Sequence, residues 1–548
     1  MPIHGMLRSG DGVVPGDVEL SGDLINSDPD FETPAMYDLV VIGGGSGGLH
    51  LATLAARVGA KVALIDKRPP GEKGWLAACV PSKGLVQAAR LVRQIRGASE
   101  FGIHVEPPRV DLASVLNRLR SVSEAFAADR SDEALAARGI DVFHGTAAFE
   151  AYDTVLLDGA KRVEGQRFVI ATGSRPAPPK IPGLGEAGCL DDASLWSLTR
   201  VPESLTVIGA GPIGMEFAQV FARLGSKVTV LTDEDRVLPR EDPEISGHVA
   251  CMLTGEGVTI KRRALIDKIE KRGDQKVCIY KDGDTGERAE VSSAEILCAS
   301  ARLANVEHLN LEAVGVHADP EHGIEVNELL QTHAVRVFAI GDVLKRNQYA
   351  HAAEAEAEVA FQNAVLRRRR KMDYTNLPWA TFLDPEVATV GISEAQAKAD
   401  DLEHHLFRVN YADIDRARIE GRTEGFTKVV ASPSGKILGA TILGMQASLI
   451  LQQLVLAMDA GLGLGDLAET TQIYPTYGQV IRELAGQFRT TRLERGFMAT
   501  ALRFFYGFQP RTDAVDGASS RTPGAPIGSD DDASAASHST GPAHRHGH

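Results

Sequence analysis

Two short glycine-rich stretches and one cysteine are the residues whose types and spacing indicate chemistry. Residues 43–48 read GGGSGG and residues 209–214 read GAGPIG, so both have the GxGxxG spacing. Such loops let the backbone approach the phosphates of a dinucleotide, and the helix that follows supplies N–H donors and a positive dipole. The cysteine is Cys79, in the string Cys-Val-Pro-Ser-Lys. These residues predict two phosphate-binding sites and a candidate redox thiol.

The first glycine-rich stretch lies in a strand–loop–helix–strand pattern. Residues 37–42 predict a buried parallel strand, an Ala- and Leu-rich helix runs to Val58, and a second strand covers residues 61–65. Asp66 ends that strand, at the spacing where a carboxylate accepts hydrogen bonds from a ribose. Three glycines permit the tight turn, the approach of a pyrophosphate and the packing of helix on strand: Gly43, Gly45 and Gly48. The whole pattern argues against a glycine-rich turn without a ligand.

The same pattern recurs around the second stretch, with strands predicted at 205–208 and 227–231. Its glycines are Gly209, Gly211 and Gly214. Two such units imply two dinucleotides, or a dinucleotide and a flavin, brought face to face. The second strand is followed by Thr232 and then by three carboxylates at 233–235, which would repel a 2′-phosphate. We therefore expect NADH to be favoured over NADPH, although Arg236 keeps NADPH open.

Several segments together resemble the pyridine nucleotide–disulfide oxidoreductases, which include dihydrolipoamide dehydrogenase, glutathione reductase and mercuric reductase. They are the Cys79 string, a chain crossing between domains at 170–176, a second FAD motif at 338–342 and the start of a dimerisation domain at 383–391. Residues 415–417 and 474–476 look most like the mercuric-reductase-like branch. The resemblance covers residues 36–505 in order and implies two Rossmann-type domains, an α+β dimerisation domain, FAD, a nicotinamide cofactor and a homodimer.

The resemblance also implies roles for particular residues. Cys79 would lie beside the flavin, and Lys83 would lie near the flavin N5 and pair with Glu216. Tyr474 would complete the site of the partner subunit. The crossing and the second motif would contact FAD through Thr172, Gly173, Gly341 and Asp342, where Asp342 binds the ribityl chain.

The chain departs from the family pattern at three places. The first redox cysteine is replaced by Gly74, so no intrachain redox disulfide is expected there. The His and Glu of dithiol enzymes are replaced by Tyr474 and Gln479, which cannot act as an imidazole–carboxylate base near pH 7. Ala301 replaces a glycine and narrows the space for the nicotinamide cofactor.

The surroundings of Cys79 suggest an activated thiol. Pro81 fits the first turn of a helix, so Cys79 would lie at the N-terminus of that helix, where the dipole lowers a thiol pKa. Lys83 shares a face with Cys79. The alternative is a small buried hydrophobe. The other four cysteines are scattered singly and are expected to be structural, without a disulfide framework or metal site.

Composition sets the remaining expectations. The net charge of -15 argues against a nucleic-acid partner, no apolar stretch is long enough to span a bilayer, and a cytoplasmic location is expected. We expect disordered ends at 1–35 and 509–548, an FAD domain from 36–184 and 316–374, a nicotinamide domain at 185–315 and a dimerisation domain at 375–508. The Arg-rich, aromatic segment 490–508 could lie on a membrane surface, but its glycines favour packing on the dimer.

These expectations give an FAD-dependent NAD(P)H oxidoreductase that passes hydride to FAD and electrons on to an unidentified small acceptor, without an intrachain dithiol relay. Two alternatives remain open. One is dihydrolipoamide dehydrogenase or mercuric reductase proper. The other is a degenerate flavin-binding sensor or scaffold with little turnover, which the replacements Gly74, Gln479 and Ala301 would favour.

Overall fold

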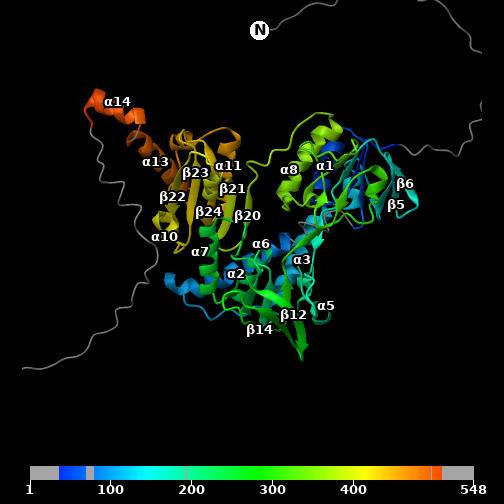
Figure 1. The fold of residues 1–548 in the computed structure, drawn as a ribbon, viewed down its shortest axis with the longest axis horizontal. Helices are drawn as coiled ribbons and strands as arrows, with labels where there is room; N and C mark the ends of the chain where they lie inside the picture. Colours follow the sequence, from blue (N-terminus) through cyan, green and yellow to red (C-terminus); the bar gives the residue numbers. More distant parts are fainter. Residues whose placement is uncertain (1–35, 69–78, 192–193, 495, 509–548) are drawn as a thin grey trace, which may run out of the picture.

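The structure is a computed structural model that describes residues 36–68, 79–191, 194–494 and 496–508. Three α/β lobes make up this part of the chain, and two of them are built on parallel sheets (Figure 1). This confirms the predicted fold class. The ends predicted to be disordered, and Gly74, lie outside the described residues.

The first lobe is a five-stranded parallel sheet with helices on its faces. Its order is β19 (Val337–Ala339), β7 (Phe168–Ile170), β1 (Leu39–Ile42), β2 (Val62–Asp66) and β3 (Ile140–His144). Helices α1 (Ser46–Arg57) and α8 (Ala350–Ala360) pack against each other, and α4 spans Asp132–Ala136. A small antiparallel sheet completes this lobe, with β4 (Ala147–Ala151), β5 (Thr154–Leu157) and β6 (Lys161–Glu164).

The second lobe repeats the design with a four-stranded parallel sheet. Its order is β11 (Thr259–Lys261), β10 (Lys227–Leu231), β9 (Ser204–Ile208) and β15 (Glu295–Cys298), with α6 (Pro212–Leu224) and α7 (Pro243–Gly255) as its long helices and α5 (Leu184–Ala187) as a short one. An antiparallel sheet of β12 (Leu265–Arg272), β13 (Gln275–Lys281) and β14 (Arg288–Ser293) lies beside it. The chain crosses between the two lobes through β8 (Ser174–Pro176) and β16 (Arg302–Ala304), which pair antiparallel.

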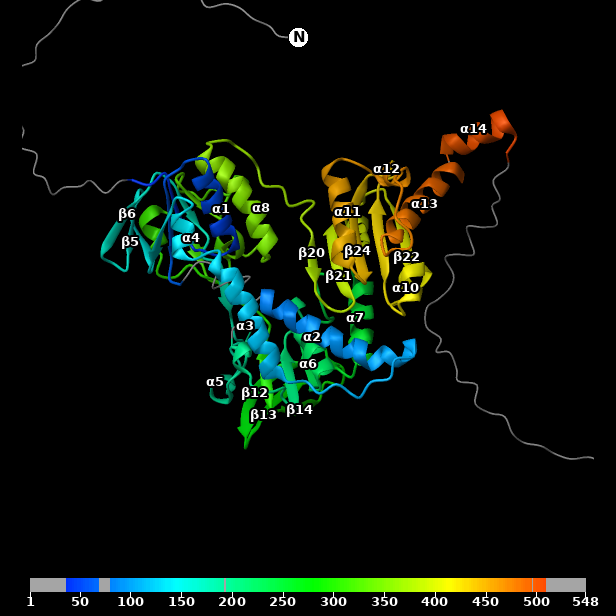
Figure 2. The same ribbon diagram turned by 180° about the vertical axis from the view of Figure 1, so that it is seen from behind.

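The C-terminal lobe is an antiparallel sheet covered by helices. Its order is β20 (Trp379–Thr381), β21 (Glu386–Gly391), β24 (Ile437–Gly444), β23 (Phe426–Ala431) and β22 (His405–Asn410). Helix α11 (Ala447–Asp459) packs on β21 and β24, and α9 (Glu394–Ala399), α10 (Asp415–Ile419) and α12 (Leu464–Ala468) are short. The chain then continues into α13 (Gln479–Glu494), which packs against β22 and α12, and into α14 (Gly496–Tyr506), which extends away from the sheet (Figure 2).

Core packing crosses the predicted domain boundaries in two places. Helices α2 (Val80–Gly97) and α3 (Leu112–Ala128) follow the first Rossmann unit in sequence, yet their apolar faces join the core of the second lobe. Ala304 already packs into the core of the first lobe, ahead of the boundary expected at residue 316. Both departures result from side-chain packing between residues far apart in sequence, which local sequence patterns cannot predict.

A buried aspartate ties the second and C-terminal lobes together. Asp384 is completely buried and forms ion pairs with Arg223 at 2.7 Å and Arg422 at 2.5 Å. Burial alone would raise the pKa of Asp384, but Arg422, Arg223 and Arg90 outweigh burial and hold that pKa below its ordinary value. A buried charge is stable only when it is paired in this way, so Asp384 fixes how α2, α6 and the C-terminal sheet meet. No helix among the described residues has the length and apolar character needed to cross a bilayer.

Candidate cofactor and redox site

The residues predicted for the first nucleotide site converge at one edge of the first sheet. Strands β1, β2, β7 and β19 are parallel, so their carboxyl ends lie together. Gly43, Asp66, Thr172 and Gly341 follow or end these four strands. Segments separated by up to three hundred residues in the chain therefore share one edge, which is where open α/β sheets bind ligands.

The glycines of the first loop are required by the space around them. Gly43 has a φ of +114°, and a Cβ there would lie 2.3 Å from the carbonyl oxygen of Ala171. A Cβ at Gly48 would lie 2.0 Å from the carbonyl oxygen of Gly43, so loop and helix are in direct contact. At Gly45, the N-cap of α1, no atom lies within 4 Å of such a Cβ. The backbone is thus crowded on the protein side and open where a pyrophosphate would sit.

Side chains at the same edge are held by hydrogen bonds. The backbone N–H of Gly44 donates to Asp66 Oδ2 at 2.6 Å, which fixes this carboxylate beside the glycine loop. Ser174 Oγ donates to Asp342 Oδ2 at 2.7 Å. Thr172 Oγ1 donates to the carbonyl of Asn305 at 2.7 Å, which ties the crossing segment to the returning chain. A phosphate cradle with two carboxylates positioned for hydroxyl groups fits the pyrophosphate, ribose and ribityl parts of FAD.

Glu356 is a residue of this site that the sequence analysis did not identify. Its side chain is completely buried in α8. It accepts hydrogen bonds from the Gly341 N–H at 2.5 Å and from the Tyr374 hydroxyl at 2.7 Å. Burial raises the pKa of Glu356 to about 7, and Asp342 adds to this effect. Acidic residues stand at 354, 356 and 358, and only the helix phase in the folded structure shows that the middle one faces the loop.

The second loop has the same backbone construction as the first. Gly209 has a φ of +107°, and a Cβ at Gly214 would lie 2.1 Å from the carbonyl oxygen of Gly209. Gly211, the N-cap of α6, has open space where its Cβ would be. This site therefore fits a second pyrophosphate at the N-terminus of α6.

The residues that would select the nicotinamide cofactor lie around the end of β10. Thr232 is buried and its hydroxyl accepts a hydrogen bond from the Glu234 N–H, while the three acidic residues at 233–235 are exposed. Arg236 donates to the carbonyl of Pro239 at 2.7 Å. Ala301 is exposed just before β16, at the crossing between the two lobes.

Cys79, Lys83 and Glu216 come together at the start of α2. Cys79 is the N-cap of this helix, with a proline in the first turn, as the sequence predicted. Lys83 Nζ lies 2.8 Å from Glu216 Oε2, so the expected ion pair is present. Glu216 is buried in α6, and its other oxygen accepts the N–H of Phe382 at 2.7 Å. Lys83 Nζ also lies 4.5 Å from the centre of the Phe382 ring. Glu216 therefore fixes Lys83 between the second and C-terminal lobes.

The electrostatics of Cys79 differ from the prediction. Desolvation raises the pKa of the Cys79 thiol above its ordinary value, although the residue is exposed at the end of the helix. Lys83 and Arg302 lower this pKa, whereas Glu216 and Asp342 raise it. The expectation of a lowered thiol pKa was wrong, because desolvation by the surrounding protein, together with Glu216 and Asp342, outweighs the lowering by Lys83 and Arg302. Because Asp342 is one of the groups that raise this pKa, Cys79 lies within electrostatic range of Asp342 in the first site.

The other four cysteines lie in the second lobe, and none forms a disulfide with Cys79. All five cysteines of the chain are free. Cys278 and Cys298 are buried in one cluster of the second lobe, with Cys189 packed against it. Burial raises the pKa of the Cys278 thiol to about 12. Cys251 is exposed on α7. No described cysteine is bonded to Cys79, and the described residues contain no cluster of three or more His, Cys, Asp or Glu that could hold a metal ion.

Tyr474 lies in the C-terminal lobe and contacts residues of that lobe. Its hydroxyl donates to Asp415 Oδ2 at 3.1 Å, and this carboxylate raises the pKa of Tyr474. The side chain is 59% exposed, so it is available to another chain. Gln479 begins α13 and is buried, and its Oε1 has no hydrogen-bond partner among the described residues.

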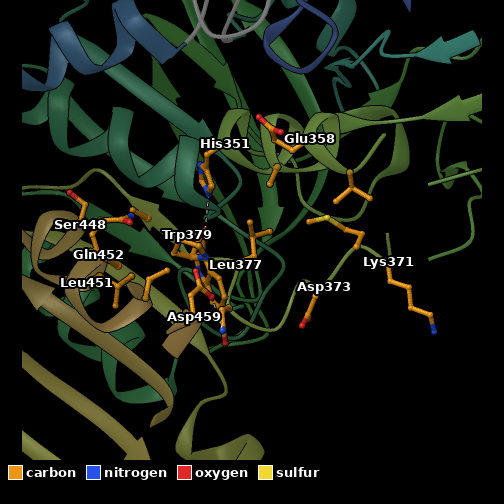
Figure 3. Close-up of a pocket in the computed structure, with 18 of the residues that line it drawn as sticks. His351, Glu358, Lys371, Asp373, Leu377, Trp379, Ser448, Leu451, Gln452 and Asp459 are labelled. Carbon is orange, nitrogen blue, oxygen red and sulfur yellow. Dashed lines mark hydrogen bonds between the residues drawn. The ribbon is translucent and has the colours of Figure 1, made fainter. Parts of the chain in front are cut away.

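A cavity of about 850 Å³ lies apart from both glycine loops (Figure 3). It is lined by α8, the connecting segment 370–378, β20 and α11, with His351, Trp379 and Asp459 among its lining residues. His351 Nε2 lies 2.7 Å from the carbonyl oxygen of Pro378. Cys79, Lys83 and Glu216 do not line this cavity, which lies between the first and C-terminal lobes. Phe382 does line it and also contacts Lys83 and Glu216, so the cavity borders that ion pair.

Comparison with family models agrees with this arrangement. Residues 37–358 match the family described as "Pyridine nucleotide-disulphide oxidoreductase". Residues 377–485 match "Pyridine nucleotide-disulphide oxidoreductase, dimerisation domain". Together the two models cover most of the chain and span both glycine loops, the Cys79 helix and the C-terminal sheet.

Individual proteins are similar over the same region. The chain is 32% identical over 454 residues to a mercuric reductase of Lysinibacillus sphaericus, covering 82% of each protein. It is 31% identical over 457 residues to a dihydrolipoyl dehydrogenase of Halobacterium salinarum, covering 82% of this chain and 95% of that protein. A solved structure, the HOCl-induced flavoprotein disulfide reductase RclA from Escherichia coli, superimposes with a TM-score of 0.73 at 27% identity, over 82% of this chain and 99% of that one.

Proposed function

The chain belongs to the pyridine nucleotide–disulphide oxidoreductase family, and on that premise we propose that it is an FAD-dependent NAD(P)H oxidoreductase without an intrachain dithiol relay. The observation that carries the proposal is the lone position of Cys79. It lies within electrostatic range of Asp342 and beside Lys83, whereas the other cysteines lie in the second lobe. Gly74 stands where the family resemblance places the first of the two redox cysteines.

Different residues of the chain would bind the two cofactors. When bound, FAD supplies a group that accepts a hydride from a reduced nicotinamide and passes the electrons on. Gly43, Gly45 and Gly48 would hold its pyrophosphate, and Asp342 its ribityl chain. Gly209, Gly211 and Gly214 would hold the pyrophosphate of the nicotinamide cofactor, for which we favour NADH.

Lys83 would supply the fixed positive charge of the redox site. Glu216 positions it by an ion pair at 2.8 Å, and a cation beside a flavin favours the negative charge that reduction creates. The pKa of Cys79 is raised, so at neutral pH the side chain is held as the thiol until a bound group changes its surroundings. This leaves two routes for the electrons: directly to the acceptor, or through Cys79 as a single-cysteine relay.

A homodimer is part of the proposal, in keeping with the match to a dimerisation domain. Leu449 and Leu456 lie two helical turns apart on α11 and are 67% and 69% exposed. Tyr474, also exposed, would then reach the redox site of the neighbouring chain. An apolar stripe of this kind on the surface of a lobe is typical of a protein interface.

Anaerobic titration of the purified protein with NADH tests the proposal. We expect rapid bleaching of the visible flavin bands in the wild type and in Cys79→Ser, because hydride transfer to FAD needs no second sulfur. A panel of a quinone, Cu(II), Hg(II), oxygen and oxidised lipoamide then identifies the acceptor class. Turnover within about threefold of wild type in Cys79→Ser would eliminate the relay through that sulfur.

Two results would contradict the proposal. Reduction of oxidised lipoamide as the fastest reaction would restore the dithiol alternative. A flavin that NADH does not bleach would favour a sensor or scaffold. Cys251→Ser is the matched control, because Cys251 is also exposed but lies on α7, outside the site.

A further inference from the structure

The C-terminal helix α14 carries an exposed aromatic cluster that the proposed function does not use. Phe504, Phe505, Tyr506 and Phe508 are 82%, 74%, 67% and 60% exposed. They contact one another: the rings of Phe504 and Phe505 meet edge to face with centroids 5.1 Å apart, and those of Tyr506 and Phe508 are stacked at 5.7 Å. Four large aromatic side chains in five residues, all facing solvent, are costly for a helix that stays in water.

The position of α14 separates it from the family's dimerisation domain. The family model ends at residue 485, before α14 begins at Gly496. Helix α13 starts just after the Tyr474 segment, and its 16 residues make it about 24 Å long. It thus carries α14 to the opposite end from Tyr474. Both views show α14 projecting beyond the lobe (Figures 1 and 2), and among the described elements only α13 packs against it extensively.

The charge around this cluster is opposite to that of the whole protein. Residues 486–508 contain four arginines and one glutamate, whereas the chain has a net charge of -15. Arg489, Arg492 and Arg503 are exposed and form no ion pair with a described residue. Basic charge beside exposed aromatic rings complements a surface that is apolar below and negatively charged above.

The helix geometry separates the two kinds of residue. With 3.6 residues per turn, Phe504 and Phe505 flank Ala501 on one side of α14, and Arg503 points to the other side. The helix ends at Tyr506 and is followed by Gly507, which has a φ of +66° and donates its N–H to the carbonyl of Arg503. Eleven residues are far too few to span a bilayer, so such a helix can only lie in its interface.

From these observations we propose that α14 docks the protein on the surface of an anionic lipid bilayer. Phe504 and Phe505 enter the boundary between headgroups and acyl chains, and the arginines of α13 and α14 contact lipid phosphates. Both glycine loops and Cys79 lie in the body of the protein, away from α14. Docking would therefore localise the enzyme at the membrane without altering its cofactor and redox site.

Flotation of the full-length, FAD-loaded protein with vesicles tests this inference. Wild type is expected to float with vesicles rich in phosphatidylglycerol at least about tenfold more tightly than with phosphatidylcholine vesicles, and less tightly as salt is raised. F504S/F505S should weaken binding by about tenfold or more to anionic vesicles. R489Q/R492Q/R503Q should remove the preference for anionic lipid. Val335→Ser, which changes a 69% exposed apolar residue of the first lobe, should bind as wild type.

Two results would overturn the inference. The first is wild type that stays unbound with anionic vesicles, or F504S/F505S that floats as wild type does. The second is F504S/F505S that turns a dimer into a monomer in light scattering, which would show that a second copy covers the cluster. Unchanged flavin absorbance and an unchanged rate of bleaching by NADH confirm that the variants are folded. A failure of lipid binding leaves the proposed oxidoreductase function untouched, because bleaching measures that function separately.

Discussion

The two glycine-rich sites share a backbone but differ in what surrounds it. In both, the first glycine has a positive φ, the second faces open space at a helix N-terminus, and the third touches the carbonyl of the first. The first site then gathers Asp66, Thr172 and Asp342 from strands across the sheet and rests on the buried Glu356. The second ends its neighbouring strand with a buried threonine and three exposed acids.

This difference matches the proposed assignment of FAD to the first loop and of the nicotinamide cofactor to the second. A pyrophosphate is bound by backbone N–H groups, so the GxGxxG geometry is kept at both places. A cofactor that stays bound is held by side chains from several strands, as at the first site. A cofactor that must enter and leave needs fewer such contacts, and charge near the ribose then selects which nicotinamide binds.

The largest expected effect comes from placing a methyl group against the backbone of each glycine loop in turn. Gly48→Ala places a methyl group about 2.0 Å from the Gly43 carbonyl oxygen, so we expect protein purified without flavin colour. Gly214→Ala creates the same clash with Gly209, yet this protein should keep its FAD and lose bleaching by NADH by about 100-fold or more. Flavin absorbance and stopped-flow bleaching measure both outcomes.

The control for these variants is Gly247→Ala on the exposed side of α7, where a Cβ meets no atom within 4 Å. Gly48→Ala that retains stoichiometric FAD would contradict the assignment of the first loop. A colourless Gly214→Ala would show that the two sites are not independent.

Glu356→Gln tests the raised pKa of the buried carboxyl group that contacts the first site and has no counterpart among the described residues of the second. The folded pKa of about 7 is above the ordinary value of 4.5, so the folded state binds more protons than the unfolded state between these values. Stability is therefore lost as pH rises through this window. Glu356→Gln cannot titrate and so keeps its stability. Between pH 5 and pH 8, its free energy of unfolding should therefore rise relative to that of wild type by up to about 3 kcal/mol.

Urea unfolding at the two pH values measures this difference. Glu354→Gln, which removes an exposed carboxylate two residues earlier on the same helix, is the matched control. A constant difference between Glu356→Gln and wild type at all pH values would show that folding does not raise the pKa of Glu356.

The smallest expected effect concerns the acids of the second site. D233N/E234Q/D235N should raise kcat/KM for NADPH relative to NADH by about three- to tenfold, because exposed charges repel a 2′-phosphate only through solvent. The ratio of the two steady-state values is the measurement, and added salt should shrink the effect. A wild type that prefers NADPH would reverse the assignment and point to Arg236 as the residue that binds the phosphate.

The sequence by itself determined the two Rossmann units, the Cys79 helix and the Lys83–Glu216 pair. Glycine spacing, strand periodicity and proline at a helix start are local consequences of backbone sterics, so each can be recognised in a short segment. The Lys83–Glu216 ion pair was predicted from the family resemblance, without structural information. The same local signals could not show that α2 packs on the second lobe or that Asp384 is surrounded by arginines.

The tertiary structure alone decided the environment of the buried and surface groups. The pKa of Cys79 is raised because burial by the surrounding protein, and then two carboxylates distant in sequence, outweigh the nearby Lys83 and Arg302. Glu356 rather than Glu354 faces the loop because α8 packs against α1 with one particular phase. The aromatic side chains of α14 remain exposed because α13 carries that helix away from the rest of the chain. Burial and charge sum over residues far apart in sequence, so only the folded chain fixes their values.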